Sequence, residues 1–530
     1  MALYPMSSTD PENVNNAPGD GPLRAGGKSF ASYDLRPVDL PSTMTPTIES
    51  QQQSLQIVRD LWGGTQTVRE RGQQYLPREP GEDAANYSVR LRRSVFFNVF
   101  RHTVEGLAGF IFRKDPVLGT DVPEIIAEHW ENIDNAGMHG DVFARSLLTD
   151  AMVSGHAGIL VEYPDTGMMP LSLADEQALG LRPYWVAIKK DDIVSTRMVC
   201  HNGLEHLVQM VLRESYFVPD GAYGEKAQTR YRVLYHDLET GEVGWRLEGL
   251  TENGKGLIVY DHGLFTNQEQ IPLAEVPTPG RLGAWNSRPQ FLDLAYLNIA
   301  HYQQWSDYAT CIHKTNVPIL VTSGVEVDGG LVVGPNTGLN FSAPDAKAYY
   351  VAHDGHALAS SKASLDDLKN DMAALGLAAL ANSKRIAETA TAKEIDKSAS
   401  DASLAVTARG VQDAIEQALH FHARYLKLPD GGSVQVNREF GSTRIGAADV
   451  MAWAALSDKL GVPLMTVLSA LRTGGWIPDD ANLEEIAMES MANMQSMADH
   501  AAATTASTLD TTSNPQDMTV GVDPAAMAGA

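Results

Sequence analysis

The pattern of apolar and polar positions between Pro289 and Tyr425 predicts long helices that bracket a small β-rich insert. Over residues 289–314, bulky side chains recur at steps of three and four residues, the spacing of one helix face. β-Branched runs separated by Gly, Pro and Asn turns follow over 317–355 and predict short strands. The positions on the helix face are Phe291, Leu294, Asn298, His301, Trp305, Tyr308 and Ile312.

Two further helices are predicted after the insert. The first carries apolar residues at helical spacing, namely Leu365, Leu368, Met372 and Leu375. Residues 383–400 then lack a clean apolar period, so we expect a loop there. The last helix restarts with a long apolar face, which consists of Leu404, Ala408, Val411, Ile415, Leu419, His422 and Tyr425. No part of this pattern is typical of a catalytic site, and it suggests a protruding module held between two helices.

The N-terminal half changes from helical to strand patterning. Helices are expected over about 47–112, with a Gly- and Pro-marked loop at 61–82, and again over 141–154. The run at 87–113 reads as one helix, in which one face can hold Leu91, Val95, Val99, Leu107 and Ile111. Alternating patterns between about 158 and 267 predict strands. These strands are expected at 184–190, 206–218, 229–238 and 243–249.

After the central helices, a short strand is predicted at 433–440 and a helical unit at 449–475. The two ends have loop-like compositions. Residues 1 to about 45 are rich in Pro, Gly, Ser and Asn, and the segment from about 498 is rich in Ala, Thr and Ser.

Composition narrows the class of protein. A hydrophobic content of 43% and a charged content of 20% are typical of a folded soluble protein, and 530 residues predict several domain-sized units. No apolar run approaches the roughly 18 to 20 residues of a membrane span, and the N-terminus lacks a signal-peptide pattern. The two cysteines, Cys200 and Cys311, form no motif, which fits a reducing compartment.

The net charge of −25 argues against a protein that grips nucleic-acid phosphates. The charge is unevenly distributed, however. Six basic residues and one acid lie between Arg90 and Lys114, whereas nine acids and no Lys or Arg follow Arg472. The basic cluster is either a solvated helix face or a partner-binding surface.

No catalytic, cofactor or metal site is predicted. The segment Gly26–Ser29 resembles the end of a phosphate-binding loop, but Pro22 stands where such a loop needs glycine. His353 and His356 lack a third ligand at a recognised spacing. His420 and His422 are two positions apart on a helix and therefore point in different directions.

Four blocks in order resemble bacteriophage portal proteins, the ring-shaped connectors at one capsid vertex. The likeness is strongest to a portal subgroup often catalogued as a domain of unknown function. It extends over most of residues 50–480. The blocks are RERGQQYLPREPGE (69–82), TVEGLAGFIFRKDP (103–116), FLDLAYLNIAHYQQWSDY (291–308) and IAETATAKEI (386–395).

The resemblance implies an α+β fold, a mainly helical portal fold with a β-rich wing and clip, assembled as a ring. It also implies a division of the chain into parts named for their place in that ring. These are an extended arm (1–46), the wing (47–284), a stem helix (285–315), the clip (316–356), a second stem helix (357–382), the tunnel loop (383–400), a long helix with a return wing strand (401–446), the crown (447–497) and an acidic low-complexity tail (498–530).

The implied function is a non-enzymatic conduit for packaging and ejection of double-stranded DNA. The implied ring has about twelve copies, which together carry about −300 charges, so the wall would hold DNA phosphates weakly. The implied partners are the terminase large subunit, a head-to-tail adaptor, the major capsid protein and scaffold, with no membrane. The implied location is the virion, after assembly in the host cytoplasm. Tunnel-loop residues expected near DNA are Lys384, Arg385, Glu388, Thr389, Lys393, Glu394 and Lys397.

Two alternatives remain open from the sequence. One is a hydrolytic enzyme that acts through paired carboxylates in a cleft. The other is a monomeric minor head protein. Neither needs a ring with a central channel, so ring assembly separates both from a portal.

Overall fold

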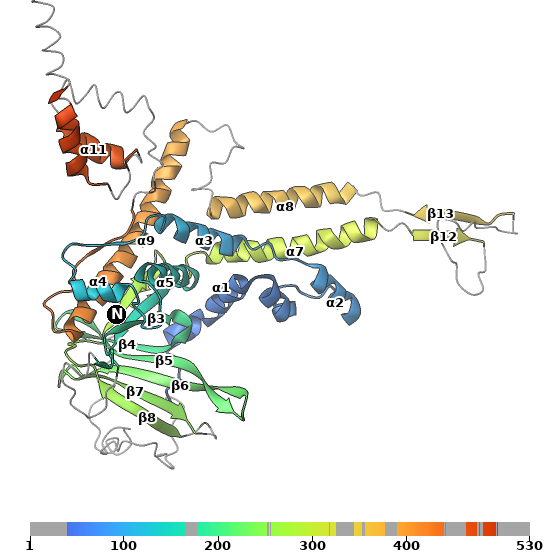
Figure 1. Cartoon of the computed structure of the whole chain (residues 1–530). Coiled ribbons are helices and arrows are strands. Elements are labelled where there is room, and N and C mark those ends of the chain that lie inside the picture. The colour runs from blue at the N-terminus through green and yellow to red at the C-terminus, as the bar shows by residue number, and fades with distance from the viewer. Residues whose placement is uncertain are drawn as a thin grey trace, which may run out of the picture. The chain divides into compact units, whose positions relative to one another are not determined.

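The computed structural model describes two compact units, which divide after Phe440 (Figure 1). Within the described residues the fold is α+β, as the sequence predicts. The residues described are 40–164, 178–251, 254, 256–316, 319–324, 344–351, 356–376, 390–438, 440, 463–473, 476–477, 481–493 and 495–496.

Five helices precede the strand-rich region. They are α1 (Pro46–Arg71), α2 (Ala84–Arg93), α3 (Val99–Ile111), α4 (Glu124–Trp130) and α5 (Gly140–Ser154). Helix α1 continues through the predicted start of the 61–82 loop, because Leu61 and Val68 are buried on either side of a kink at Gly64. Gly64 has a φ of 78°, which glycine adopts at little cost.

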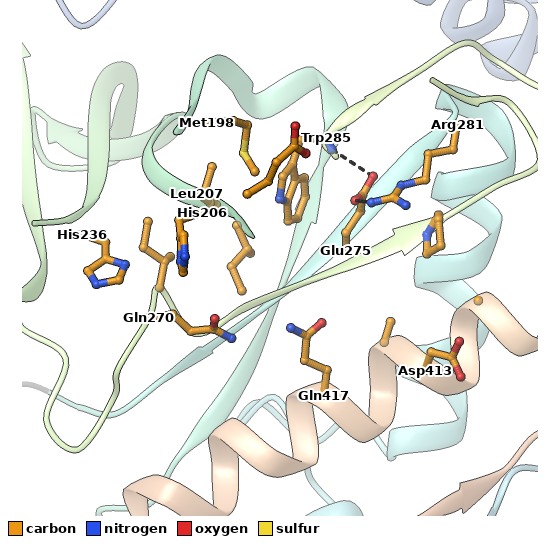
Figure 2. A pocket seen from close by; sticks show the side chains of 16 residues that line it. Met198, His206, Leu207, His236, Gln270, Glu275, Arg281, Trp285, Asp413 and Gln417 are labelled. Atoms are coloured by element: carbon orange, nitrogen blue, oxygen red, sulfur yellow. Dashed lines mark hydrogen bonds and ion pairs between the residues drawn. The ribbon is translucent and has the colours of Figure 1, made fainter. Parts of the chain in front are cut away.

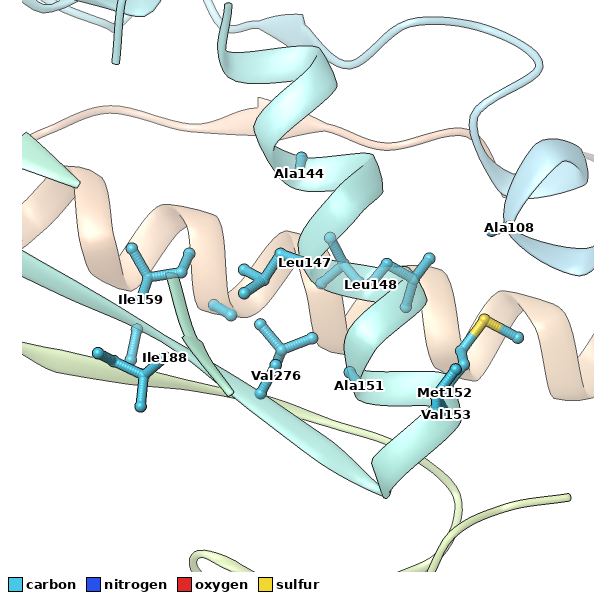
Figure 3. Close-up of a cluster of buried hydrophobic side chains, with 14 of the residues drawn as sticks. Ala108, Ala144, Leu147, Leu148, Ala151, Met152, Val153, Ile159, Ile188 and Val276 are labelled. Carbon is cyan, nitrogen blue, oxygen red and sulfur yellow. The ribbon is translucent and has the colours of Figure 1, made fainter. Parts of the chain in front are cut away.

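The first unit is built around a three-stranded antiparallel sheet with β2 (His156–Glu162) at its centre. Strand β3 (Tyr184–Lys189) pairs on one side and β9 (Leu273–Pro277) on the other, so Ile159 lies between Ala187 and Ala274. Every residue of β2 is buried. Leu147 and Leu148 of α5 belong to one apolar cluster with the sheet residues Ile159, Ile188 and Val276 (Figure 3).

A second, five-stranded antiparallel sheet follows as a simple meander. Three of its strands match the predictions at 206–218, 229–238 and 243–249, whereas the strand predicted at 184–190 is β3 of the first sheet. A short 3₁₀ turn (Lys190–Asp192) leads into it from β3. Its strands are β4 (Ile193–His201), β5 (Leu204–Asp220), β6 (Gly224–His236), β7 (Val243–Leu250) and β8 (Leu257–Leu264).

Two short strand pairs lie outside these sheets: β1 (Val117–Leu118) with β14 (Val434–Gln435), and β10 (Arg281–Gly283) with β11 (Asn286–Ser287). The predicted strand near 434–440 therefore exists, but it pairs beside the N-terminal helices rather than in the strand-rich sheets. In the second unit, α11 (Leu464–Thr473) and a helical stretch at 483–493 enclose Leu468, Leu483 and Ala487.

The central region follows the predicted order. Helix α7 (Leu292–Thr315) leads to strand β12 (Ile319–Ser323), which pairs antiparallel with β13 (Lys347–Val351). Helix α8 (His356–Leu375) then returns beside α7, and α9 (Ala390–Tyr425) follows. All seven apolar-face positions predicted for the last helix are buried, from Leu404 to Tyr425.

The prediction of a single helix over 87–113 is wrong. The chain leaves the helical path after Arg93 and re-enters it at Val99, because Asn98 caps α3 by accepting a hydrogen bond from Arg101 N. Val95, placed on the predicted apolar face, is 53% exposed. The break lets the backbone of Phe97 and Phe100 bond to a side chain of α7.

The loop expected over 383–400 is helical in its second half, since α9 begins at Ala390. Residues 390–400 contain Ala, Lys, Glu and Ile, which tolerate a helix without a marked apolar period. Residues 383–389 lie outside the described residues.

Replacing Asn298 with leucine should lower the free energy of unfolding by about 1 to 3 kcal/mol, because the buried Phe100 N–H loses its acceptor. Asn298 Oδ1 accepts this bond at 3.0 Å, and its Nδ2 donates to Phe97 O at 2.8 Å. Urea unfolding followed by circular dichroism measures the change. Cys311→Ser, at an exposed position of the same helix, is the matched control and should change stability by less than about 0.5 kcal/mol. Equal stability of the two variants would contradict the prediction.

Candidate functional site

The most distinctive feature of the molecule is a projection made of two long helices and a strand pair. Helix α7 has 24 residues and α8 has 20, so they are about 36 and 30 Å long. The chain leaves α7, forms β12 and β13, and comes back along α8. Figure 1 shows the strand pair lying beyond the adjacent ends of the two helices.

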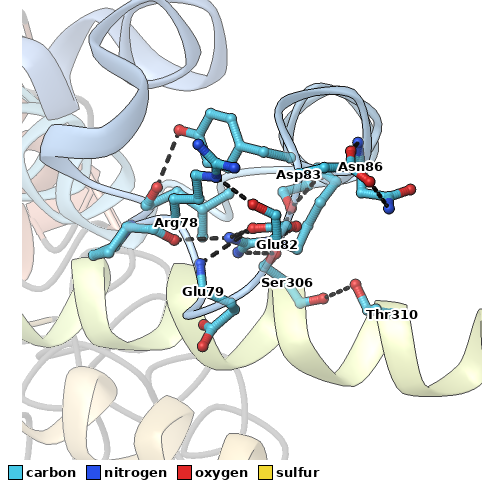
Figure 4. Close-up of polar contacts among 12 residues, drawn as sticks. Arg78, Glu79, Glu82, Asp83, Asn86, Ser306 and Thr310 are labelled. Carbon is cyan, nitrogen blue, oxygen red and sulfur yellow. Dashed lines mark hydrogen bonds and ion pairs between the residues drawn. The ribbon is translucent and has the colours of Figure 1, made fainter.

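The side of α7 that faces α2 is held by a buried polar cluster (Figure 4). The Arg90 guanidinium of α2 donates two hydrogen bonds to Glu82, at 2.9 and 2.8 Å, and one to Pro77 O at 2.7 Å. It also lies 3.4 Å from Ser306 Oγ of α7, and Ser94 Oγ lies 2.8 Å from the same oxygen. This arginine is only 5% exposed, so it needs these partners.

The electrostatics of the cluster agree with its geometry. The hydrogen bonds from Arg90 hold the pKa of Glu82 below its usual value, and the same contacts raise the pKa of Arg90. A paired, bidentate geometry of this kind fixes orientation as well as charge. The cluster therefore sets the position of α7 against α2.

A second polar cluster holds the segment before α2. The Asp60 carboxylate accepts hydrogen bonds from Tyr75 OH at 2.7 Å and from Arg71 Nε at 3.0 Å. Gln303 of α7 donates to the Tyr75 carbonyl at 2.9 Å. Burial, with added contributions from Asp60, raises the pKa of the Tyr75 hydroxyl. Tyr75 thus remains a neutral donor near neutral pH, and the loop is fastened to both α1 and α7.

Helix α8 is held much less firmly. Among its described side chains, those at 358–376, only Leu365 and Met372 are buried. Ser364 Oγ donates to Gln304 Oε1 of α7 at 3.1 Å, and the Lys369 ammonium lies 6.0 Å from the centre of the Phe97 ring. The remaining surface of α8 is largely exposed.

The strand pair at the end of the projection exposes apolar and aromatic groups. Tyr349, Tyr350 and Val351 of β13 are 50%, 62% and 48% exposed. Aromatic side chains with this exposure are common in protein contact surfaces. The chain between the two strands, residues 325–343, is outside the described part.

The predicted tunnel-loop residues are only partly placed. Lys393, Glu394 and Lys397 lie in the first turns of α9, where the backbone alone is described. Lys384, Arg385, Glu388 and Thr389 lie outside the described residues, so their proximity to one another or to DNA stays a prediction.

A polar cavity of about 310 Å³ lies where α9 meets β9 and the five-stranded sheet (Figure 2). Burial raises the pKa of Glu275 at its rim, but both carboxylate oxygens already have partners. Arg281 donates to one oxygen at 3.1 Å and Trp285 N to the other at 3.1 Å. A carboxylate held in this way is a structural ion pair rather than a free general acid or base. The other polar side chains at the cavity are Glu205, His206, His236, Gln270, Asp413 and Gln417.

Within the ranges that the structure describes, no three His, Cys, Asp or Glu side chains are grouped so that they could hold a metal ion. Nor does any described helix have the length and apolar character needed to cross a membrane.

A histidine pair joins α4 to α9, with His422 buried and His129 half-buried. The apolar period places His422 on the inner face of its helix, but nothing in the sequence points to His129 as its partner. His129 Nδ1 lies 2.9 Å from His422 Nε2, and Trp185 Nε1 donates to His422 Nδ1 at 3.2 Å. An indole nitrogen can only donate, so His422 must carry its proton on Nε2 and donate it to His129. His420 on the same helix is exposed, as the two-residue spacing predicts.

Both histidines of this pair are held neutral. Burial, with the nearby positive charge of Arg182, lowers the pKa of His129 to about 4. Burial also lowers the pKa of His422 to about 3, with smaller effects of His129 and Arg182. A proton added to either ring would break the bond between them or the bond to Trp185.

Acid should therefore destabilise the fold through this pair. In the unfolded chain these two histidines bind protons below about pH 6.5, whereas in the folded chain they do so only at about pH 4 or lower. The stabilisation is complete above about pH 6.5 and is lost as pH falls, by up to about 1.4 kcal/mol per pH unit for each histidine.

Urea unfolding between pH 4 and 8 measures this slope. The variant His422→Gln should have a flatter dependence of stability on pH. The control variant His420→Gln changes an exposed histidine on the same helix and should keep the slope of the wild type. Part of the slope should persist in both variants, because burial also lowers the pKa of His156 to about 3. Identical slopes for the two variants would show that the pair does not titrate as described.

Comparison with known proteins gives one match to a family. Residues 290–426, which run from just before α7 to the end of α9, match a domain described as "Domain of unknown function (DUF4055)". No curated protein matches the chain.

Solved structures give only weak similarities. The chain is similar to "Virion of native gene transfer agent (GTA) particle" at 10% identity and a TM-score of 0.35, covering 75% of this chain and 94% of that one. It is similar to "Neck of empty GTA particle computed with C6 symmetry" at 11% identity and a TM-score of 0.35, with coverages of 73% and 92%. It is similar to "Neck of native GTA particle computed with C12 symmetry" at 11% identity and a TM-score of 0.34, covering 73% of this chain and 91% of that one. Similarities of this size carry no argument about function.

Proposed function

We propose that this chain is a phage portal protein that forms a ring of about twelve copies at one capsid vertex. In this role it is a conduit for packaging and ejection of double-stranded DNA and not an enzyme. The observation that carries the proposal is the projection: two adjacent long helices, joined through a strand pair at their far ends, followed by the long helix α9. This order is the one that the resemblance to portals assigns to stem helix, clip, second stem helix, tunnel loop and long helix.

The exposed surface of α8 supports assembly into a ring. A helix with two buried side chains among those described gains little from folding within one chain, since most helix stability comes from a packed face. Neighbouring copies in a ring would cover that surface. The interface would be heterologous, since a ring of more than two copies closes by joining two different surfaces of each copy.

The end of the projection is the proposed docking site for the terminase large subunit and later for the head-to-tail adaptor. Tyr349, Tyr350 and Val351 supply exposed aromatic and apolar area there. The major capsid protein and scaffold would contact other parts of the ring. ATP hydrolysis during packaging would belong to the terminase.

The charge of the chain suits a channel through which DNA slides. Each DNA phosphate that a protein neutralises releases counterions and so adds to the affinity for DNA. A channel wall rich in basic residues would therefore bind the DNA and slow its passage. A net charge of −25 for each copy avoids this. We propose the segment 383–400 as the tunnel element, with Lys384, Arg385, Glu388, Thr389, Lys393, Glu394 and Lys397 near the DNA. Asp396 is the third acid of the segment, so its four basic and three acidic residues nearly balance.

Electron microscopy of the purified protein, with its mass measured in solution, tests the ring. We expect closed rings of about twelve copies around a channel wide enough for duplex DNA. A compact monomer or dimer at all concentrations would overturn the proposal, and would favour a minor head protein or a carboxylate enzyme. An assay for hydrolytic activity would then follow.

Deleting residues 385–397 should leave ring assembly intact but impair DNA packaging or retention. The reason is that the segment precedes the buried face of α9, which starts at Leu404 and anchors the helix. A variant with the same number of Gly and Ser residues in place of 385–397 separates the effect of length from that of charge. Loss of rings in both variants would mean that the segment is structural and the tunnel assignment is wrong.

A further inference from the structure

Helices α2 and α8 lie on opposite sides of α7. Ser306 of α7 contacts Arg90 and Ser94 on the α2 side, and Gln304 contacts Ser364 of α8. Gln304 and Ser306 are two residues apart, so they point about 200° apart around the helix axis. Figure 1 shows the same arrangement, with α8 and α2 on either side of α7.

The outer side of α2 carries an exposed positive charge. Arg90 faces α7, so Arg92 points about 200° away from it, outward. Arg92 is exposed and donates a hydrogen bond to Ser88 O at 3.3 Å within its own helix. Among the described residues, no carboxylate forms an ion pair with it. Val89 beside it is 43% exposed. This outer face also includes Ala85 and Ser88, and Arg92 presents its cation at the C-terminal end of the face.

The outer side of α8 has the opposite charge in a similar setting. Asp367 points about 200° away from the buried Leu365, and it lies about 60° around the helix from Ser364, which bonds to α7. Asp367 is exposed, and it has no ion pair with any residue that the structure describes. Its neighbours one turn away are Ala363, Ser364, Asn370 and Asp371, and Asp371 adds a second exposed carboxylate on this side of the helix. Asp366 and Lys369, at the flank, pair with each other at 3.7 Å.

We propose that the outer face of α2 in one copy packs on the outer face of α8 in the next, with Arg92 and Asp367 forming an ion pair between subunits. This inference rests on the proposed ring and names the surfaces that join its copies. The two faces have opposite charge and small neighbouring side chains, and they lie on opposite sides of α7. Each copy can therefore bind one neighbour on each side, as a heterologous ring requires.

The charges also disfavour a two-fold pairing of identical faces. Two α2 faces would bring Arg92 against Arg92, and two α8 faces would bring Asp367 against Asp367. Like charges that are brought together at an interface oppose association. The same surfaces therefore select head-to-tail joining over a closed dimer.

Charge reversal tests the pairing in the full-length protein. In Arg92→Glu every α2–α8 contact sets a glutamate against an aspartate, and in Asp367→Arg every contact sets two arginines against each other. Each variant alone should need at least about a tenfold higher concentration than the wild type to form rings at low salt. Native mass spectrometry and electron microscopy measure the ring fraction.

An equimolar mixture of the two variants is the decisive measurement. In an alternating ring, the glutamate introduced into α2 of one variant meets the arginine introduced into α8 of the other. At the next interface, the unchanged Arg92 meets the unchanged Asp367. Every interface is then complementary, so the mixture should form rings with equal numbers of the two variants. The double variant R92E/D367R should also recover assembly. Neither rescue is expected if a single reversal merely damages the fold.

The matched controls are Lys226→Glu and Asp220→Arg, exposed reversals on β6 and β5 away from both faces. They should assemble as the wild type does. Suppose that the wild type forms rings. If both single reversals then form rings as well as the wild type does, or if the mixture fails to recover ring assembly, the Arg92–Asp367 pairing is wrong, and the portal proposal stands. If the wild type forms no ring, the portal proposal fails first, and this inference falls with it.

Discussion

The direction of the α7–α8 projection depends on buried polar bonds beneath α7. Arg90, Glu82 and Ser306 form one group, and Asn298 bonds to the backbone at Phe97 and Phe100. Apolar packing alone tolerates small slides of one helix along another, whereas a buried donor or acceptor that loses its partner costs free energy. These bonds therefore define one register of α7 against α2 and α3.

The two long helices that follow are anchored unequally, and this difference bears on assembly. The face of α9 from Leu404 to Tyr425 is buried in the main core, and the His129–His422 bond adds a polar tie to α4. Helix α8 has only Leu365 and Met372 buried among its described side chains. Its exposed surface is thus available to a partner, whereas α9 belongs to the body of the chain.

Local periodicity could predict the elements that have one continuous buried face. The last helix is the clearest case, because its apolar face repeats without interruption and every predicted position is buried. For α7 the prediction holds through Leu294, Asn298 and His301 and then shifts, since the buried side continues at Tyr302 and Ser306 rather than Trp305. The shift follows from α2, which packs on that side of the helix.

The sequence by itself determined most of the long helices and strands, because these follow from spacing within short windows, and the resemblance to portals implied the α+β class. Only the tertiary structure decided which distant groups meet. His129 and His422 are far apart in the chain, and Arg90 reaches Ser306 only because the helix breaks at Ser94. The physical reason is that such contacts gain their energy from burial and from a partner brought close by the fold, and neither is encoded in the local pattern of polar and apolar residues.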